Sequence, residues 1–334
     1  STLDRSSAAS DVYKRQDRTR PMTRTRPPPK IALPVVLMVA LLIATTLGSV
    51  GTVAAAGDAR SVTDDRGRTV RLAAPARRII ALAPHIAENL FAIGAGPQVI
   101  GTVSYSDYPE AAEAVPRIGN HGALDMERII ALKPDLIIAW VSTANRRQAE
   151  RLETMGFTVY YSDSHTFDEL ASTFERIGHL TGHDDTATAL AMRFRQRIAT
   201  LQRQYAEAPP VRVFYQVWDQ PLMTVSDQHL IAKAIAVCGG VNIFGGLDAL
   251  IPRISPENVL AQDPEVIVAG GMGEANHQWL QAWRRWPQLR AVRNAQLHFI
   301  PPSLLQRHTP RLLEGTERLC KALDEARRVQ APPP

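Results

Sequence analysis

One sequence pattern occurs twice in this chain, and it constrains the fold more than any other feature. Residues Glu127–Trp140 read ERIIALKPDLIIAW, and residues Glu257–Gly270 read ENVLAQDPEVIVAG. Each copy passes from a glutamate through apolar residues and an alanine to a proline, an acidic residue and an apolar run. A short helix that leads through proline into a buried strand is an αβ unit. Two such units at matching places predict two lobes that are built alike.

The segments around the two copies alternate between strand and helix patterns. In the first half, short apolar strands are expected at residues 79–83, 99–103 and 158–161. The second half starts a similar alternation with the strand VRVFYQV at Val211. Buried strands that alternate with helices are typical of a parallel sheet covered by helices. We therefore predict an α/β fold with two lobes, each built on a central, mostly parallel sheet flanked by helices.

A long segment between the two halves lacks strand patterns. Residues 184–208 are charged and free of glycine and proline, and Pro209 and Pro210 end this stretch. We predict a helix hairpin or one bent helix that connects the lobes. The predicted organisation is therefore a leader over residues 1–56, an N-terminal lobe over 57–166, a connecting helical segment over 167–210 and a C-terminal lobe over 211–330.

The first 56 residues have the composition of an export signal. A basic run at residues 23–30 precedes an uncharged stretch, Ile31–Val53, and three alanines end at Ala56. This order predicts a signal peptide over residues 22–56 that is cleaved after Ala56. An uncut membrane anchor is the alternative, because 23 uncharged residues can span a bilayer. Residues 1–21 precede the first methionine and fit neither part of a signal, so our hypothesis is that they are translated upstream sequence.

The basic character of the chain belongs to this leader. Eight of the 38 Lys and Arg residues and three of the 33 Asp and Glu residues lie in residues 1–56, so the other 278 residues carry 30 of each sign. A balanced net charge offers no general attraction for nucleic acid or for an anionic membrane surface. Cys238 and Cys320 are the only cysteines. In an exported chain they are expected to pair, with two buried free thiols as the alternative.

Sequence motifs of catalysis are absent. The chain contains no Gly-x-Ser-x-Gly elbow, glycine-rich phosphate loop, His-Glu-x-x-His or Cys-x-x-Cys motif. His179 and His183 lie four residues apart but straddle Gly182, so a solvated turn is favoured over a metal site. We therefore expect a binding protein rather than an enzyme, without catalytic residues, a metal site or a cofactor of its own.

In a two-lobed α/β protein, ligand contacts come from loops at the strand ends that face the other lobe. Apolar rings there would cover a large flat ligand, and polar groups would orient it. Ordinary packing is the alternative for each residue; Trp140 could equally belong to the core, and His308 could cap the last helix. The candidates in such loops are Tyr105, His121, Trp140, Trp218, Met223 and His308.

Several longer runs resemble a known family. SYSDYPEAA at residues 104–112 and the segment 118–140 are similar to the periplasmic cobalamin-binding proteins of bacterial ABC importers, and so are CGGVNIF at 238–244 and ISPENVLAQDPE at 254–265. The resemblance covers roughly residues 78–327. The segment ERIIALKPDLIIAW is shared by a wider class that includes haem and iron-siderophore binders. Within this wider class, SYSDYP and the placement of the two cysteines favour the cobalamin-binding proteins.

The resemblance implies two α/β lobes joined by one rigid helix, with the ligand between them, and a disulfide between Cys238 and Cys320. It also implies that Glu127 and Glu257 dock against arginines of the membrane permease. Charge pairs at an exposed rim mainly set orientation and association rate, and a favourable first-turn helix charge is the simpler alternative for each glutamate.

From this resemblance we expect a monomeric periplasmic substrate-binding protein. It would capture cobalamin or a related corrinoid and deliver it to an ABC permease dimer in the inner membrane. A haem or ferric-siderophore binding protein of the same class is the alternative.

The ligand loops depart from the cobalamin-binding pattern. That pattern has tryptophan where this chain has His121, Ile251 and Leu304, and phenylalanine where it has Val217 and Met223. Tyr105 and Trp140 match the cobalamin-binding pattern. Trp218 directly follows Val217 and partly compensates for the aromatic ring that is missing there. The cleft is therefore open to a different corrinoid or to another flat ligand. His121 or His308 could coordinate the metal of such a ligand, although a simple contact is the favoured interpretation.

Overall fold

The structure is a computed structural model that describes residues 59–120, 122–141, 146–270, 273 and 277–330. The predicted leader and the candidate ligand residue His121 lie outside the described residues. All described elements belong to one compact unit, residues 55–334. Among the described residues, no helix is long and apolar enough to cross a membrane.

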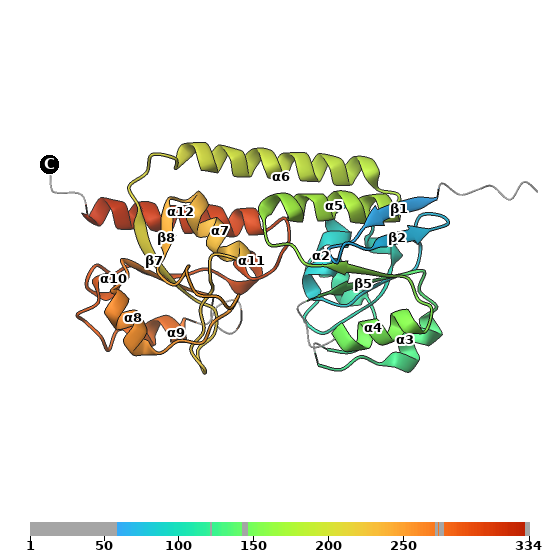
Figure 1. The fold of residues 1–334 in the computed structure, drawn as a ribbon, viewed down its shortest axis with the longest axis horizontal. Coiled ribbons are helices and arrows are strands. Elements are labelled where there is room, and N and C mark those ends of the chain that lie inside the picture. Colours follow the sequence, from blue (N-terminus) through green and yellow to red (C-terminus); the bar gives the residue numbers. More distant parts are fainter. Residues whose placement is uncertain (1–58, 121, 142–145, 271–272, 274–276, 331–334) are drawn as a thin grey trace, which may run out of the picture. The chain divides into compact units, whose positions relative to one another are not determined.

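Two four-stranded parallel sheets form the framework, as the sequence predicts (Figure 1). Their strand orders are β4-β3-β5-β6 and β8-β7-β9-β10. In each sheet the first strand lies between the second and the third, and the fourth pairs with the third. The two lobes therefore share one topology. The strands are β3 (Ile79–Ala81), β4 (Val99–Thr102), β5 (Leu136–Trp140), β6 (Val159–Ser162), β7 (Val211–Gln216), β8 (Gly240–Asn242), β9 (Val266–Ala269) and β10 (Leu297–Phe299).

Helices cover these sheets, and most apolar residues of the inner strands β3, β5, β7 and β9 are fully buried beneath them. In the first lobe the chain begins with an antiparallel pair, β1 (Arg60–Thr63) and β2 (Thr69–Leu72). The other elements of this lobe are α2 (Pro84–Ala92), η1 (Gly96–Gln98), η2 (Glu110–Ala114), α3 (Met126–Leu132) and α4 (Arg146–Thr154). The second lobe contains α7 (Leu230–Val237), α8 (Pro256–Gln262), α9 (Gln278–Trp283), α10 (Arg290–Arg293), α11 (Pro302–Leu305) and α12 (Leu312–Gln330).

The repeated sequence pattern corresponds to the units α3–β5 and α8–β9. Asp125 and Ser255 cap the two helices by accepting hydrogen bonds from the backbone N–H three residues later, at 2.9 and 3.4 Å. Both helices end at a residue with positive φ, Lys133 or Asp263, directly before the proline.

The acidic residue after that proline also has a structural role in both copies. Asp135 accepts hydrogen bonds from the backbone N–H groups of Arg77 and Arg78, at 2.7 and 3.0 Å, just before β3. Glu265 accepts one from the N–H of Arg212 in β7, at 2.7 Å. In each lobe the carboxylate therefore ties the third strand to the beginning of the first.

The predicted helical segment is a helix hairpin made of α5 (Phe167–Thr181) and α6 (Asp184–Gln204). The turn between them depends on Gly182, whose φ of 76° is in the left-handed region that favours glycine. Phe174 of α5 packs edge-on against Phe194 of α6, with ring centroids 5.7 Å apart. Helix α6 runs beside α5 and then beside α12 (Figure 1), where Arg197 pairs with Glu317 at 2.7 Å.

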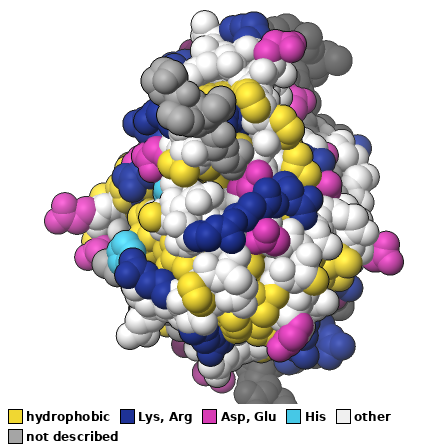
Figure 2. All heavy atoms as spheres, turned by 90° about the vertical axis from the view of Figure 1, so that its left-hand side faces the viewer, with side chains coloured by type: hydrophobic (Ala, Val, Ile, Leu, Met, Phe, Trp, Pro, Cys, Tyr) yellow, Lys and Arg dark blue, Asp and Glu magenta, His cyan; other side chains and the backbone are white. Residues whose placement is uncertain are grey.

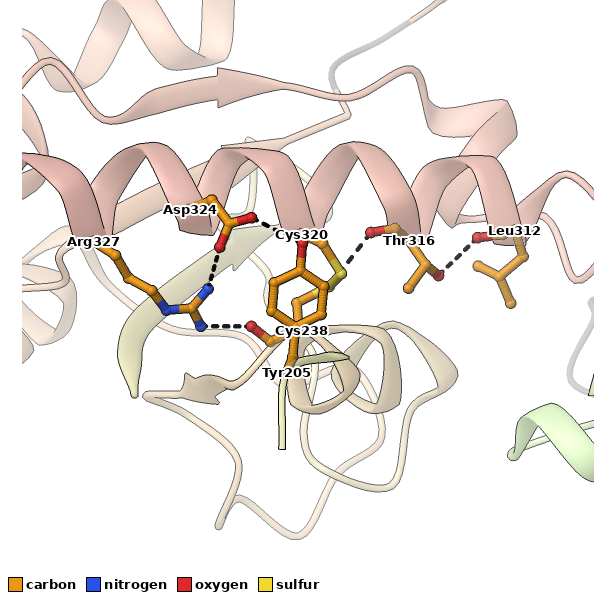
Figure 3. Close-up of a disulfide and its surroundings, with 7 residues drawn as sticks. All are labelled: Tyr205, Cys238, Leu312, Thr316, Cys320, Asp324 and Arg327. Carbon is orange, nitrogen blue, oxygen red and sulfur yellow. Dashed lines mark hydrogen bonds and ion pairs between the residues drawn. A yellow bond between two sulfur atoms is a disulfide. The ribbon is translucent and has the colours of Figure 1, made fainter. Parts of the chain in front are cut away.

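The predicted disulfide is present. Cys238, at the end of α7, is bonded to Cys320 in α12 (Figure 3). Arg327 donates to the backbone oxygen of Cys238 at 2.6 Å and pairs with Asp324 at 2.8 Å. Asp324 also accepts a 2.8 Å hydrogen bond from the Tyr205 hydroxyl at the end of α6. Covalent and polar links therefore join α6, α7 and α12.

The distribution of charged side chains on the surface is consistent with the balanced net charge of the residues that follow the leader. Figure 2 shows the face of the molecule that carries α8 and α10, on which basic and acidic side chains are interspersed. In this lobe Arg290 pairs with Asp263 at 3.0 Å and with Glu265 at 2.9 Å. Such pairing leaves no broad field of one sign on this face.

Candidate functional site

A cavity of about 190 Å³ is lined by residues from both lobes. Trp140 is the last residue of β5, and Asp163 follows β6 directly. On the side of the second lobe, Val217 follows β7, and Gln306 and His308 follow α11. Open parallel sheets bind ligands beyond the carboxyl ends of their strands. The volume is below the roughly 300–1,000 Å³ of small-molecule sites, so a large ligand would place only one part of itself here.

Trp140 forms a half-buried aromatic wall of this cavity. Its indole Nε1 donates a hydrogen bond to Asp163 Oδ1 at 3.1 Å, which fixes the plane of the ring. His85 meets the indole edge-on, with centroids 5.1 Å apart, and His308 lies 6.1 Å away. Trp140 and His308, two of the predicted ligand residues, are therefore brought together from different lobes.

Three imidazoles gather at this point. The ring of His308 lies 6.0 Å from those of both His85 and His229. Burial, together with the neighbouring His308 and Arg307, lowers the pKa of His85 to about 3. Burial and nearby imidazoles lower the pKa of His229 to about 3. Burial lowers the pKa of His308 to about 4, against the opposing charge of Asp163. All three rings are therefore neutral near pH 7.

Ion pairs join the lobes beside this cluster. Arg311 holds the buried carboxylate of Glu88, in α2, through two hydrogen bonds of 2.7 Å. Arg307 pairs with Asp107 at 2.7 Å and donates to the backbone oxygen of Tyr105 at 3.1 Å. Although burial opposes the shift, the hydrogen bond from Arg307 lowers the pKa of Asp107. The described structure therefore holds its two lobes together with charged groups as well as through helix α6.

Replacing Glu88 by alanine is expected to lower the free energy of unfolding by about 2–3 kcal/mol, because two charged hydrogen bonds between Arg311 and the buried carboxylate would be lost. The measurement is urea unfolding followed by circular dichroism. The matched control is E314A, which removes an exposed pair with Arg318 and should cost under about 0.5 kcal/mol. Equal stabilities for E88A and E314A would contradict this assignment.

Three other predicted ligand residues, Tyr105, Trp218 and Met223, are not among the residues that line this cavity. Tyr105 is 76% exposed with a φ of 66°, and it contributes its backbone oxygen to Arg307. Trp218 packs against Trp279 of α9, with centroids 5.8 Å apart, and its Nε1 donates to the backbone oxygen of Gln220. Met223 pairs with Trp218 through backbone hydrogen bonds. Their roles as ligand contacts stay predictions, as does that of His121.

His85, His229 and the Glu88–Arg311 pair were missed by sequence reasoning. His229 precedes the apolar run LIAKAIAV, and its side chain caps α7 by accepting a hydrogen bond from the N–H of Ile231 at 3.1 Å. A histidine directly before a helix pattern was a signal that could have been used. His85 and Glu88 lie within a helix pattern that does not distinguish a buried polar residue from a solvated one.

Glu127 and Glu257 occupy the same place in the two lobes, since each is the second residue of a seven-residue helix. Both side chains are exposed. A hydrogen bond from the Ser255 hydroxyl lowers the pKa of Glu257, so this carboxylate is charged at neutral pH. Docking of the two lobes on a permease dimer would require two exposed glutamates at equivalent positions. The docking role of these glutamates stays a prediction.

In the part of the chain that the structure describes, no group of three or more His, Cys, Asp or Glu residues is arranged so that it could hold a metal ion. His179 instead contacts Asp184, at 2.7 Å, and His183 contacts the backbone oxygen of Thr181. These two histidines therefore interact locally around the α5–α6 turn.

Comparison with known proteins shows to which family this chain is similar. Residues 79–304 match the family model of periplasmic binding proteins. The vitamin B12-binding protein of Vibrio cholerae serotype O1 is 39% identical over 255 residues, which are 76% of this chain and 91% of that protein. The vitamin B12-binding protein of Photorhabdus laumondii is 37% identical over 248 residues, which are 74% of this chain and 88% of that protein.

Solved structures of periplasmic binding proteins are also similar to this chain. The crystal structure of the periplasmic vitamin B12-binding protein of Vibrio cholerae superposes with a TM-score of 0.70 at 37% identity, covering 76% of this chain and 99% of that one. A periplasmic haem-binding protein from Roseiflexus has a TM-score of 0.65 at 22% identity, covers 75% of this chain and 99% of that one, and shows a shared fold alone. The chain belongs to the periplasmic binding protein family.

Proposed function

We propose that this protein captures cobalamin or a related corrinoid in the periplasm and delivers it to an ABC permease. The observation that carries the proposal is the 39% identity to a vitamin B12-binding protein over 91% of that protein's length. The cavity lined from both lobes supports it, because Trp140 offers a large ring for contact with a flat ligand and His229 and Gln306 offer polar groups. The role is binding without catalysis, which family membership supports.

The two glutamates support a permease dimer as the partner. A symmetric dimer presents the same surface twice. Glu127 and Glu257 present the same chemistry twice from one monomer, because each lies at the second position of an equivalent helix. We therefore propose that one lobe docks on each permease subunit, after export by the cleavable signal peptide predicted over residues 22–56.

Calorimetric titration tests this function directly. The full chain is expressed with its leader, and the purified protein is titrated with cyanocobalamin and, separately, with hemin. We expect saturable binding of one cyanocobalamin, at least about tenfold tighter than hemin, which corresponds to about 1.4 kcal/mol. Tight binding of hemin without binding of cyanocobalamin would replace the corrinoid proposal by the haem alternative.

Trp140→Ala is expected to weaken cyanocobalamin binding at least about 30-fold, or about 2 kcal/mol, as for a buried aromatic anchor. W140F retains an apolar ring and should lose less, although it removes the hydrogen bond to Asp163. The control is W286A, which truncates a half-buried tryptophan outside the cavity lining. Calorimetry measures all three variants. Wild-type affinity in W140A would show that the ligand does not use this wall.

A further inference from the structure

The imidazoles that line the cavity differ in what their nitrogens can do. Nδ1 of His229 accepts the backbone N–H of Ile231 at 3.1 Å. A neutral imidazole carries one proton, so that of His229 is on Nε2. A metal ligand needs an unprotonated nitrogen with a free lone pair. His229 is therefore a hydrogen-bond donor toward the cavity and not a metal ligand.

His308 is in the opposite situation. Its backbone oxygen accepts a 3.0 Å hydrogen bond from Asn89 Nδ2, which positions the residue at the cavity wall. Its ring is neutral near pH 7 because burial lowers its pKa to about 4. Among the described residues, neither ring nitrogen has a hydrogen-bond partner, and the ring lies against the aromatic rings of His85, Trp140 and His229. One nitrogen therefore carries a lone pair without a partner.

The remaining imidazoles do not share these properties. His85 is buried edge-on against Trp140 and does not line the cavity. His165 lines the cavity but its side chain is 45% exposed, and Asp163 lies 3.4 Å away. The His308 ring is half-buried at the cavity wall, and no side-chain or backbone hydrogen bond in the described structure occupies its nitrogens. A ligand in the cavity can therefore reach them.

A metal ion carried by the ligand could use such a nitrogen. A free metal ion needs several protein ligands, and no group of three or more His, Cys, Asp or Glu side chains among the described residues is arranged to provide them. A metal already held by the four nitrogens of a macrocycle needs only a single axial donor, and neutral imidazole is a common donor to transition metals. We infer that His308 donates an imidazole nitrogen to the metal of a bound corrinoid, so that the site prefers corrinoids with an exchangeable axial ligand. This inference rests on the proposed corrinoid function.

Coordination is a ligand exchange that balances without a redox step. The bond between the metal and its axial water breaks, the bond from the His308 nitrogen to the metal forms, and the water leaves to solvent. The Nε2–H of His229 remains free to donate to a polar group of the same ligand. Cyanide leaves a corrinoid metal much less readily than water does, so the two forms should behave differently at this site.

The test compares aquacobalamin with cyanocobalamin. The absorption bands of the corrin are recorded on addition of the purified full chain, and affinities are measured by calorimetry. We expect the bands of aquacobalamin to shift on binding and its affinity to exceed that of cyanocobalamin by at least about tenfold. Cyanocobalamin should bind without the shift.

The variants H308A and H308Q should both lose the shift and the preference, with aquacobalamin affinity falling at least about tenfold more than cyanocobalamin affinity. Free imidazole added to H308A should restore the shift. The control is H298A, which removes a partly buried histidine outside the cavity lining and should keep the shift. Thermal unfolding by circular dichroism checks that each variant is folded, and H308Q keeps the test valid if H308A does not fold.

Two results would overturn the inference while leaving corrinoid binding in place. One is equal affinity for both corrinoids without a spectral shift in the wild type. The other is an unchanged shift in folded H308A or H308Q. If neither corrinoid binds to the wild type, the proposed function itself fails, and the inference fails with it.

Discussion

Cells that carry the variant E127R/E257R are expected to lose corrinoid uptake, while the purified variant binds cyanocobalamin with wild-type affinity. Each glutamate is exposed at the second position of its helix, so neither substitution disturbs the core. If arginines of the permease receive these glutamates, reversal replaces attraction by repulsion at both ends of the interface. Like charges across an interface cost several kcal/mol, and about 3 kcal/mol reduces binding more than 100-fold.

The measurement is the uptake of labelled cobalamin by cells that contain the cognate permease and that produce the variant at the wild-type level. The neutral variant E127Q/E257Q should have an intermediate effect, because it removes attraction without adding repulsion. The matched control is E113R/E207R, which reverses two other exposed glutamates and should preserve uptake. Normal uptake by E127R/E257R would rule out docking through these residues.

The variant C238A/C320A is expected to lose about 4 kcal/mol of unfolding free energy, because the bridge closes a loop of 82 residues in the unfolded chain. Both cysteines are buried, so part of the loss would come from packing between α7 and α12. Urea unfolding provides the measurement. Cyanocobalamin affinity should be retained, because neither cysteine lines the cavity between the lobes.

Wild-type protein unfolded and refolded in the presence of a reductant is the control for this prediction. It lacks the bridge but keeps both buried sulfur atoms, so its unfolding free energy should lie between those of the bridged wild type and the double variant. The links from Arg327 to Cys238 and from Tyr205 to Asp324 persist in both cases (Figure 3). A loss below about 1 kcal/mol would contradict the prediction, because the unfolded chain would then gain little freedom when the bridge is removed.

The framework could be predicted from the sequence because its determinants are local. In both copies of the repeat, a capping residue begins the helix, a proline follows its end, and an acidic side chain reaches the first strand. The Cys238–Cys320 pairing needed only an exported chain with two cysteines. Such features depend on residues that are close in the sequence or on the number of cysteines, and both can be read directly from a single sequence.

The site was predicted less completely because its contacts join distant parts of the chain. Glu88 and Arg311 are 223 residues apart, and each resembles an ordinary surface charge in its own helix pattern. The loop after β7 shows a second difficulty. Trp218 was the predicted contact, but the adjacent Val217 lines the cavity. Neighbouring residues in an extended segment point to opposite sides, so the sequence alone does not decide which of these two side chains faces the cavity.

The charged contacts between the lobes have a consequence for transport rate. Glu88–Arg311 and Arg307–Asp107 connect the lobes without any contribution from a ligand. If the glutamates dock as proposed, an empty receptor therefore offers the permease nearly the same pair of carboxylates as a loaded one. Empty molecules would then compete for the transporter. Overproduction of the receptor at scarce vitamin would slow import, because flux follows the loaded fraction instead of the total amount.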